Sequence, residues 1–254
     1  MKKVELHMHT APASACAKVD TETAVKRYKA HGYDGVMLTN HYSDACCQVK
    51  GISREEWLDL YINELHKFDK ICADNEMTGY WGAEVSLFAP YSKRMCEKYD
   101  MDFLKANYAD YLLIGVDEKF LRETPYICDL DQKDLYAVCQ QYGVLLIQAH
   151  PFRACQGHTL KDVNYLDGVE INTAMSHMIL RGEVSHEREI LEIAKKHNLI
   201  VTVGGDTHSN RADYEMLCSA TFLPDDVKTS KDVAEHLRKV RVPKYEICFP
   251  EGFE

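Results

Sequence analysis

The sequence predicts a single α/β domain in which seven short strands form a TIM-like barrel. Three observations predict it. Short apolar runs alternate with helical or long connecting segments, as in folds whose parallel strands are covered on both faces. No repeat, low-complexity tract or Pro/Gly-rich linker divides the 254 residues, so residues 1–254 are expected to form one domain. Finally, nearly every apolar run ends in a histidine or a carboxylate.

The seven expected strands are short apolar runs. They lie at residues 3–6, 35–40, 78–87, 111–116, 144–149, 167–172 and 199–204. The run Val-Leu-Leu-Ile-Gln-Ala at 144–149 is the clearest buried strand. By themselves these runs fit either an open doubly wound sheet or a closed barrel.

Helical spacing of apolar residues separates most of these strands. Helices are expected at 21–31, from residue 53 onward, and at 131–142, 185–197 and 231–239. Ser53 and Glu56 have the spacing of a capping box, and Gly32 and Gly143 are stop signals. The segment 88–110 is expected to be a long loop with a short helical piece near 93–98.

Polar side chains at the strand ends decide between the two architectures. His7 and His9 stand one residue apart, so an extended strand would aim both imidazoles at one point. The further strand-end candidates are His41, Glu84, Asp117, His150, Asp206 and His208. The carboxyl ends of barrel strands converge on one mouth, whereas an open sheet would spread these groups along a line. The pattern therefore favours a barrel with a metal cluster in its mouth.

Taken together, five motifs resemble those of the PHP (polymerase and histidinol phosphatase) family, in the same order and over nearly the whole chain. They are His7-Met8-His9-Thr10, Thr39-Asn40-His41, Gly82-Ala83-Glu84, Ala149-His150-Pro151 and Gly204-Gly205-Asp206-Thr207-His208-Ser209. The resemblance implies a distorted seven-stranded β/α barrel. It also implies two to three divalent metal ions in the mouth, with zinc, iron and manganese all suited to mixed histidine and carboxylate ligands.

The resemblance assigns ligands residue by residue. It places His7, His9, Glu84 and Asp206 around one metal. Glu84 would bridge to a second metal, held also by His150 and by Asp117, which stands after the fourth strand where the family usually has histidine. His41 and His208 would hold a third metal. The third site usually gains a further Asp, Glu or His ligand from the segment at 11–17, where this chain offers only Cys16.

The chemistry that follows is hydrolysis of a phosphoester by a hydroxide that bridges two metals, with Glu84, Asp206 and His150 as the catalytic groups. Arg153, Arg211 and Arg181 are candidates for binding the phosphate, because guanidinium groups bind phosphate oxygens well. His177 and His158 lie in loops near the expected mouth and are candidates for substrate contact.

The expected activity is that of a metal-dependent phosphatase or phosphoesterase acting on a small phosphomonoester, such as histidinol phosphate, a nucleotide or a sugar phosphate. Two alternatives remain open. One is hydrolysis of protein phosphotyrosine or removal of a terminal nucleotide. The other is a metal-retaining regulatory module without catalysis.

Composition limits the partners. The formal net charge of -10 argues against binding of long nucleic acid, although a local basic pocket for one phosphate remains compatible with it. No signal-peptide pattern or run of about 20 apolar residues occurs, so neither secretion nor a membrane span is expected. The ten cysteines contain no C-x-x-C pair and are expected to be reduced thiols in a cytoplasmic protein. Oligomeric state leaves no signal in the sequence.

Overall fold

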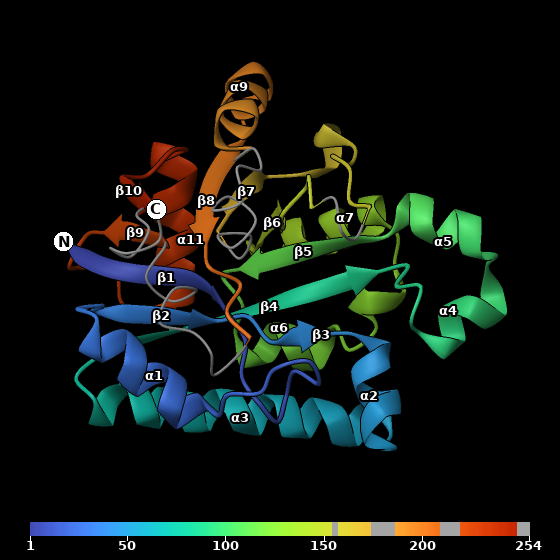
Figure 1. Cartoon of the computed structure of the whole chain (residues 1–254), viewed down its shortest axis with the longest axis horizontal. Helices are drawn as coiled ribbons and strands as arrows, with labels where there is room; N and C mark the ends of the chain where they lie inside the picture. The colour runs from blue at the N-terminus through green and yellow to red at the C-terminus, as the bar shows by residue number, and fades with distance from the viewer. Residues whose placement is uncertain (154–156, 174–185, 209–218, 248–254) are drawn as a thin grey trace, which may run out of the picture.

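The computed structural model describes residues 1–153, 157–173, 186–208 and 219–247, and a single twisted sheet lies at its centre (Figure 1). The strand order is β10-β9-β1-β2-β4-β5-β6-β7-β8, with β3 paired to β4. The bounds are β1 (Lys2–Met8), β2 (Gly35–Leu38), β3 (His41–Tyr42), β4 (Thr78–Leu87), β5 (Ala109–Ile114), β6 (Leu145–Gln148), β7 (Gly168–Asn172), β8 (Ile200–Gly204), β9 (Ser219–Leu223) and β10 (Tyr245–Ile247).

The sheet curls until its two sides nearly meet. The residues after β8 return to β1, where Thr207 forms a parallel bridge with Met8. The backbone N–H of His9 donates to the carbonyl of Thr207 over 3.0 Å. This contact confirms the expected α/β barrel and brings the end of β8 beside the end of β1.

Strand direction departs from the sequence-based expectation at one position that matters for function. β5 runs antiparallel to both of its neighbours, β4 and β6, whereas the strands were expected to be parallel. The pairs β1–β2, β2–β4, β6–β7 and β7–β8 are parallel as expected. Reversal of β5 brings its first residues, rather than its last, to the rim where the parallel strands end.

Helices cover the outside of the barrel. Their bounds are α1 (Thr21–Ala30), α2 (Asp44–Lys50), α3 (Arg54–Asp74), α4 (Lys93–Lys98), α5 (Met101–Asn107), α6 (Glu118–Glu123), α7 (Gln132–Tyr142), α9 (Glu187–His197) and α11 (Ser230–Val240), with short 3₁₀ turns at Ile127–Asp129 and Val163–Tyr165. The capping box of Ser53 and Glu56 is present, and Gly143 ends α7 in the left-handed conformation. In Figure 1, α4 and α5 project from the connection between β4 and β5.

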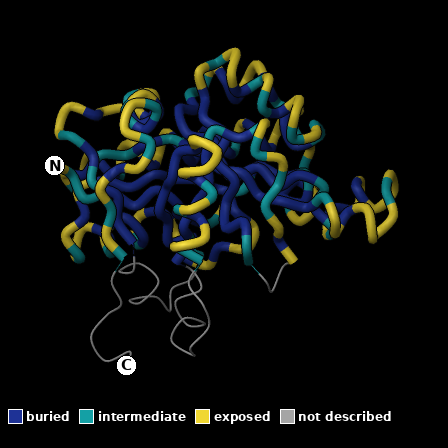
Figure 2. Tube along the Cα trace, turned by 90° about the horizontal axis from the view of Figure 1, so that it is seen from above, coloured by how far each residue is buried: buried dark blue, intermediate teal, exposed yellow. Residues whose placement is uncertain are grey.

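The inner face of the barrel supports the site. Tyr80 on β4 and Leu112 on β5 belong to one buried apolar cluster, on which the apolar side of α11 packs. Glu84 and Asp110 lie on the same faces of these two strands, because residues at even spacing along a strand share a face. The functional side chains therefore stand directly above a packed core. In Figure 2 the central strands are mostly buried, and the exposed residues gather on the outer sides of the helices and in the loops.

Among the described residues, no helix combines the length and the apolar character that a membrane span requires.

Candidate metal centre

The end of β1 brings two imidazoles to one point, as its alternation predicts. His7 and His9 are fully buried, and their Nε2 atoms lie 3.0 Å apart. Asp206 Oδ1 lies 3.2 Å from the first Nε2 and 3.1 Å from the second. Glu84 Oε2 lies 3.2 Å from His9 Nε2. These four side chains form a buried group of a size that could hold one metal ion.

His41 joins the same centre through strand pairing. β3 consists of only two residues, and its parallel register places His41 opposite Glu84. The imidazole Nδ1 of His41 lies 2.9 Å from Glu84 Oε2. On the other side, His208 Nδ1 lies 3.2 Å from Asp206 Oδ1.

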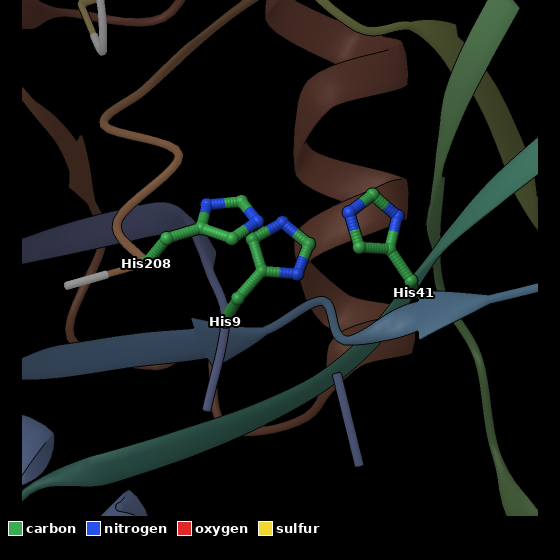
Figure 3. Close-up of side chains that lie close together, drawn as sticks. All are labelled: His9, His41 and His208. Carbon is green, nitrogen blue, oxygen red and sulfur yellow. The ribbon is translucent and has the colours of Figure 1, made fainter. Parts of the chain in front are cut away.

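Three histidines form a second group on the open side of the centre. The ring of His9 lies between the rings of His41 and His208, with centroid separations of 4.6 Å and 4.1 Å (Figure 3). Their nitrogen atoms are close enough together to share one metal ion. Burial would raise the pKa of the Cys16 thiol, but the neighbouring imidazoles of His208 and His41 lower it to about 6.

A third group lies on the opposite side of Glu84. It consists of Asp110, His150 and His158, all buried. His150 Nε2 lies 3.0 Å from Glu84 Oε1, so the glutamate contacts this group as well as the first. His158 Nε2 lies 3.8 Å from Asp110 Oδ2.

Asp117 does not join these groups, contrary to the sequence-based expectation. Its side chain accepts a hydrogen bond from the backbone N–H of Phe120 at 2.8 Å and so caps α6. It also pairs with Lys231. Because β5 is antiparallel, the residue that follows it lies at the rim away from the histidines.

Asp110, at the start of β5, takes the place expected for Asp117. Ser86 Oγ donates to Asp110 Oδ1 at 2.6 Å, and the hydroxyl of Tyr108 donates to Oδ2 at 3.0 Å. Asp110 was not expected in the site, because residues 88–110 read as a long loop from the sequence. No local pattern distinguishes the start of this strand from its end as the site-facing side, since the run 111–116 fits either direction.

Two further buried carboxylates hold the ligand side chains in place. Glu170 Oε1 lies 2.7 Å from His7 Nδ1, and its Oε2 accepts from the backbone N–H of His150 at 3.0 Å. Glu5 accepts from the backbone N–H groups of His7 at 2.8 Å and Gly205 at 2.9 Å. Carboxylates in this position fix the orientation of metal-binding histidines. Neither residue is among the site residues predicted from the sequence.

Only part of the expected phosphate-binding set can be placed. Arg153 lies in the site, with its guanidinium 3.1 Å from Asn172 Oδ1 and paired with Asp206 Oδ2. His177, Arg181 and Arg211 lie outside the described residues.

The charges of the site oppose one another over short distances. Burial by itself would lower the pKa of His7, but the carboxylates of Glu170 and Asp206 outweigh it and hold that pKa well above its ordinary value. Burial would raise the pKa of Asp206, whereas Arg153 and His7 hold it well below its usual range. The pKa of His9 falls to about 4, first through burial and then through the imidazoles beside it. His9 is therefore neutral at pH 7, the state in which imidazole binds a metal.

The unsatisfied atoms of the site fit a bound cation. Four buried side-chain atoms of the site form no hydrogen bond and have only close charged contacts: His41 Nδ1, Glu84 Oε2, His158 Nε2 and Asp206 Oδ1. A buried polar atom without a partner is costly, so natural proteins rarely leave several in one place. Divalent ions bind imidazole nitrogen and carboxylate oxygen, and the donor set fits zinc, iron or manganese.

Comparison with known proteins supports the fold. No family model matches the sequence, and no curated protein is significantly similar to it. Among solved structures, PsfC from Pseudomonas syringae is 17% identical with a TM-score of 0.59, over 99% of this chain and 93% of that chain. An amidohydrolase from Chromobacterium violaceum, solved with sulfate and no metal, is 12% identical with a TM-score of 0.51. The match covers 92% of this chain and 96% of that chain.

A third similar structure is a two-domain protein from Bacteroides vulgatus that contains a predicted PHP-like metal-dependent phosphoesterase. It is 17% identical with a TM-score of 0.60, and the match covers 94% of this chain and 63% of that one. This chain thus spans less than two thirds of that protein. The fold is that of the PHP-like and amidohydrolase barrels, which confirms the structural part of the resemblance noted in the sequence.

The reversal of β5 makes a testable distinction between two aspartates. We expect Asp110→Asn to lower the content of bound divalent metal by about one ion per chain, because a neutral amide is a poorer ligand for these ions. Asp117→Asn is the matched control, and it should retain the full content. Elemental analysis after purification without chelator measures both. Full metal content in the first variant together with loss in the second would contradict this assignment.

Proposed function

We propose that this protein is a metal-dependent phosphoesterase that hydrolyses a small phosphomonoester. The observation that carries the proposal is the position of Glu84. This single buried carboxylate lies within 3.5 Å of nitrogen atoms of four histidines: His7, His9, His41 and His150. A carboxylate shared in this way is suited to joining neighbouring divalent ions.

Two to three ions would be held by side chains of this chain. His7, His9, Glu84 and Asp206 would hold the first. Glu84 would also help to hold the second ion, together with Asp110, His150 and His158. His41 and His208 would hold the third, with Cys16 as the further ligand. When bound in such a cluster, divalent ions stabilise charge on phosphate oxygens and lower the pKa of water.

The chain's own residues would orient the substrate and the ligands. Arg153 is the arginine of the described part of the site, and its guanidinium would bind phosphate oxygens in a fixed geometry. Glu170 would hold the ring of His7 and the backbone of His150. Ser86 and Tyr108 would hold Asp110 as a charged acceptor. Arg181, Arg211 and His177 remain predicted phosphate-binding residues.

The size of the cavity favours a small substrate over the alternatives. A cavity of about 390 Å³ lies over the ligand groups, which is the scale of a small-molecule site. The acidic chain argues against long nucleic acid. Hydrolysis of protein phosphotyrosine, removal of a terminal nucleotide and a role without catalysis remain the competing functions. We also propose a reducing, cytoplasmic environment, which the seven free thiols among the described cysteines support.

Loss of the shared carboxylate tests the reaction directly. We expect Glu84→Gln to lower turnover of p-nitrophenyl phosphate by more than about 100-fold. Mutation of residues that only orient metal ligands already lowers metal affinity or activity by about 10–100-fold. Glu118→Gln, at a surface glutamate on α6, is the control and should be unaffected. Circular dichroism checks that both variants fold. A folded, metal-depleted Glu84→Gln variant with wild-type turnover would rule out a metal-dependent reaction at this site.

The role of Cys16 is tested separately. If its thiolate completes the third site, cobalt(II)-loaded protein should show thiolate-to-cobalt charge-transfer absorption in the near ultraviolet, and Cys16→Ala should abolish it. Metal content should fall from about three ions per chain to about two, because the site would keep only imidazole ligands. Cys96→Ala is the matched control, since its thiol lies elsewhere and donates to the carbonyl of Pro90. Identical spectra for wild type and Cys16→Ala would remove the thiolate from the site.

A further inference from the structure

The cavity over the metal centre has two chemically different parts. Its polar floor consists of the ligand side chains and Arg153. Its upper wall, here called the apolar wall, is formed by Ala15, Ala45, Cys46, Val49, Tyr91 and Tyr108. The proposed function uses the floor and the hydroxyl of Tyr108, and it leaves the rest of the apolar wall without a role.

One side of the apolar wall is the short helix α2. It begins just after β3, so its position is tied to His41 in the site. Ala45 and Cys46 are buried, but the side of α2 that borders the cavity also carries Val49, which is 73% exposed. A β-branched apolar side chain exposed to this extent contributes little to the core, and it lies where a ligand could cover it.

Another part of the apolar wall is a pair of tyrosines from the connection between β4 and β5. The ring of Tyr91 meets that of Tyr108 edge-on, with centroids 5.8 Å apart. Both hydroxyls are bound: Tyr91 donates to Ser86 Oγ at 3.3 Å, and Tyr108 donates to Asp110. The hydroxyl of Tyr91 is thus held, while the residue as a whole stays 55% exposed.

Ion pairs brace the two sides against each other. Arg54 pairs with Asp44 on α2 at 3.0 Å and with Asp129 at 2.7 Å. Arg94 on α4 pairs with the same Asp129 at 2.8 Å. The backbone N–H of Lys93 also donates to Gln48 Oε1 at 3.0 Å. The apolar wall is therefore preorganised in the absence of a ligand, which lowers the entropy cost of binding.

We propose that the apolar wall binds the alcohol part of the substrate and selects a flat, uncharged group, so that the preferred substrates are small aryl phosphomonoesters. This inference rests on the proposed phosphoesterase function. Among the described residues that line the cavity, the carboxylates, the imidazoles and the guanidinium all belong to the floor. Ser43 also lines the cavity, but its hydroxyl caps α2 by accepting from the backbone N–H of Ala45. A polyol or a second phosphate would therefore find few partners on the apolar wall, whereas an aromatic ring would pack against Val49 and Tyr91.

The test compares phenyl phosphate with glycerol 3-phosphate as substrates of the metal-loaded protein. We expect phenyl phosphate to have at least about tenfold higher kcat/KM, the scale on which an apolar pocket discriminates. Val49→Asp should lower that ratio by about tenfold, mainly through the KM of phenyl phosphate. Val240→Asp is the matched control, because this valine is 42% exposed on α11, outside the cavity. It should leave the ratio unchanged.

A binding measurement separates failure of this inference from failure of the proposed function. Calorimetry with phenylphosphonate and methylphosphonate should give tighter binding of the phenyl compound, and Val49→Asp should remove the difference. If no phosphoester is hydrolysed but this difference in binding is present, the inference about the apolar wall is supported and the proposed phosphoesterase function is wrong. If hydrolysis occurs with no preference for the aryl ester, or if Val49→Asp changes nothing, the inference about the apolar wall is wrong and the function stands.

Discussion

The structure of this site depends on one fully buried carboxylate, that of Glu84. Removing a charge from water is costly unless opposite charges or bound cations compensate it. Burial would raise the pKa of Glu84, but His41 and His7 hold it well below its ordinary value, so the group stays ionised. The barrel places three strands around this charge: β1 on one side, β3 in register beside it, and β5 across from it.

The direction of β5 explains both what the sequence could predict and what it could not. His7, His9, His41 and His150 follow or end strands of the common direction, so their convergence could be predicted from position alone. The presence of Asp110 in the site could not be predicted in this way, because the apolar run 111–116 looks the same in either strand direction. Periodicity identifies a strand and its faces but carries no information on its polarity. Asp117 therefore lies away from the other predicted ligands for a topological reason, and the carboxylate of Asp110, from the start of the same strand, lies beside them instead.

The carboxylates that support the ligands were missed for a different reason. Glu5 lies within β1. The role of a charged residue in an apolar run cannot be predicted until its contact partners are known. Its contacts come from Gly205 and Ser219, about 200 residues further along the chain. Such long-range contacts exist only after barrel closure. Local sequence patterns predicted the α/β class and most of the histidine positions, whereas the residues that orient those histidines depend on tertiary contacts.

The opposed charges also limit what the centre can do without ions. Arg153 pairs with Asp206, and the same carboxylate faces His7 and His208. The guanidinium pairs with Oδ2 of Asp206, whereas Oδ1 faces the histidines. A cation bound at Oδ1 would offset part of the carboxylate's charge and so weaken its attraction for Arg153. Arg153 would then become available to an anion entering the cavity. If the proposed function holds, metal loading and phosphate binding would be coupled through one carboxylate, and phosphate affinity would rise with metal content rather than being fixed by the arginine alone.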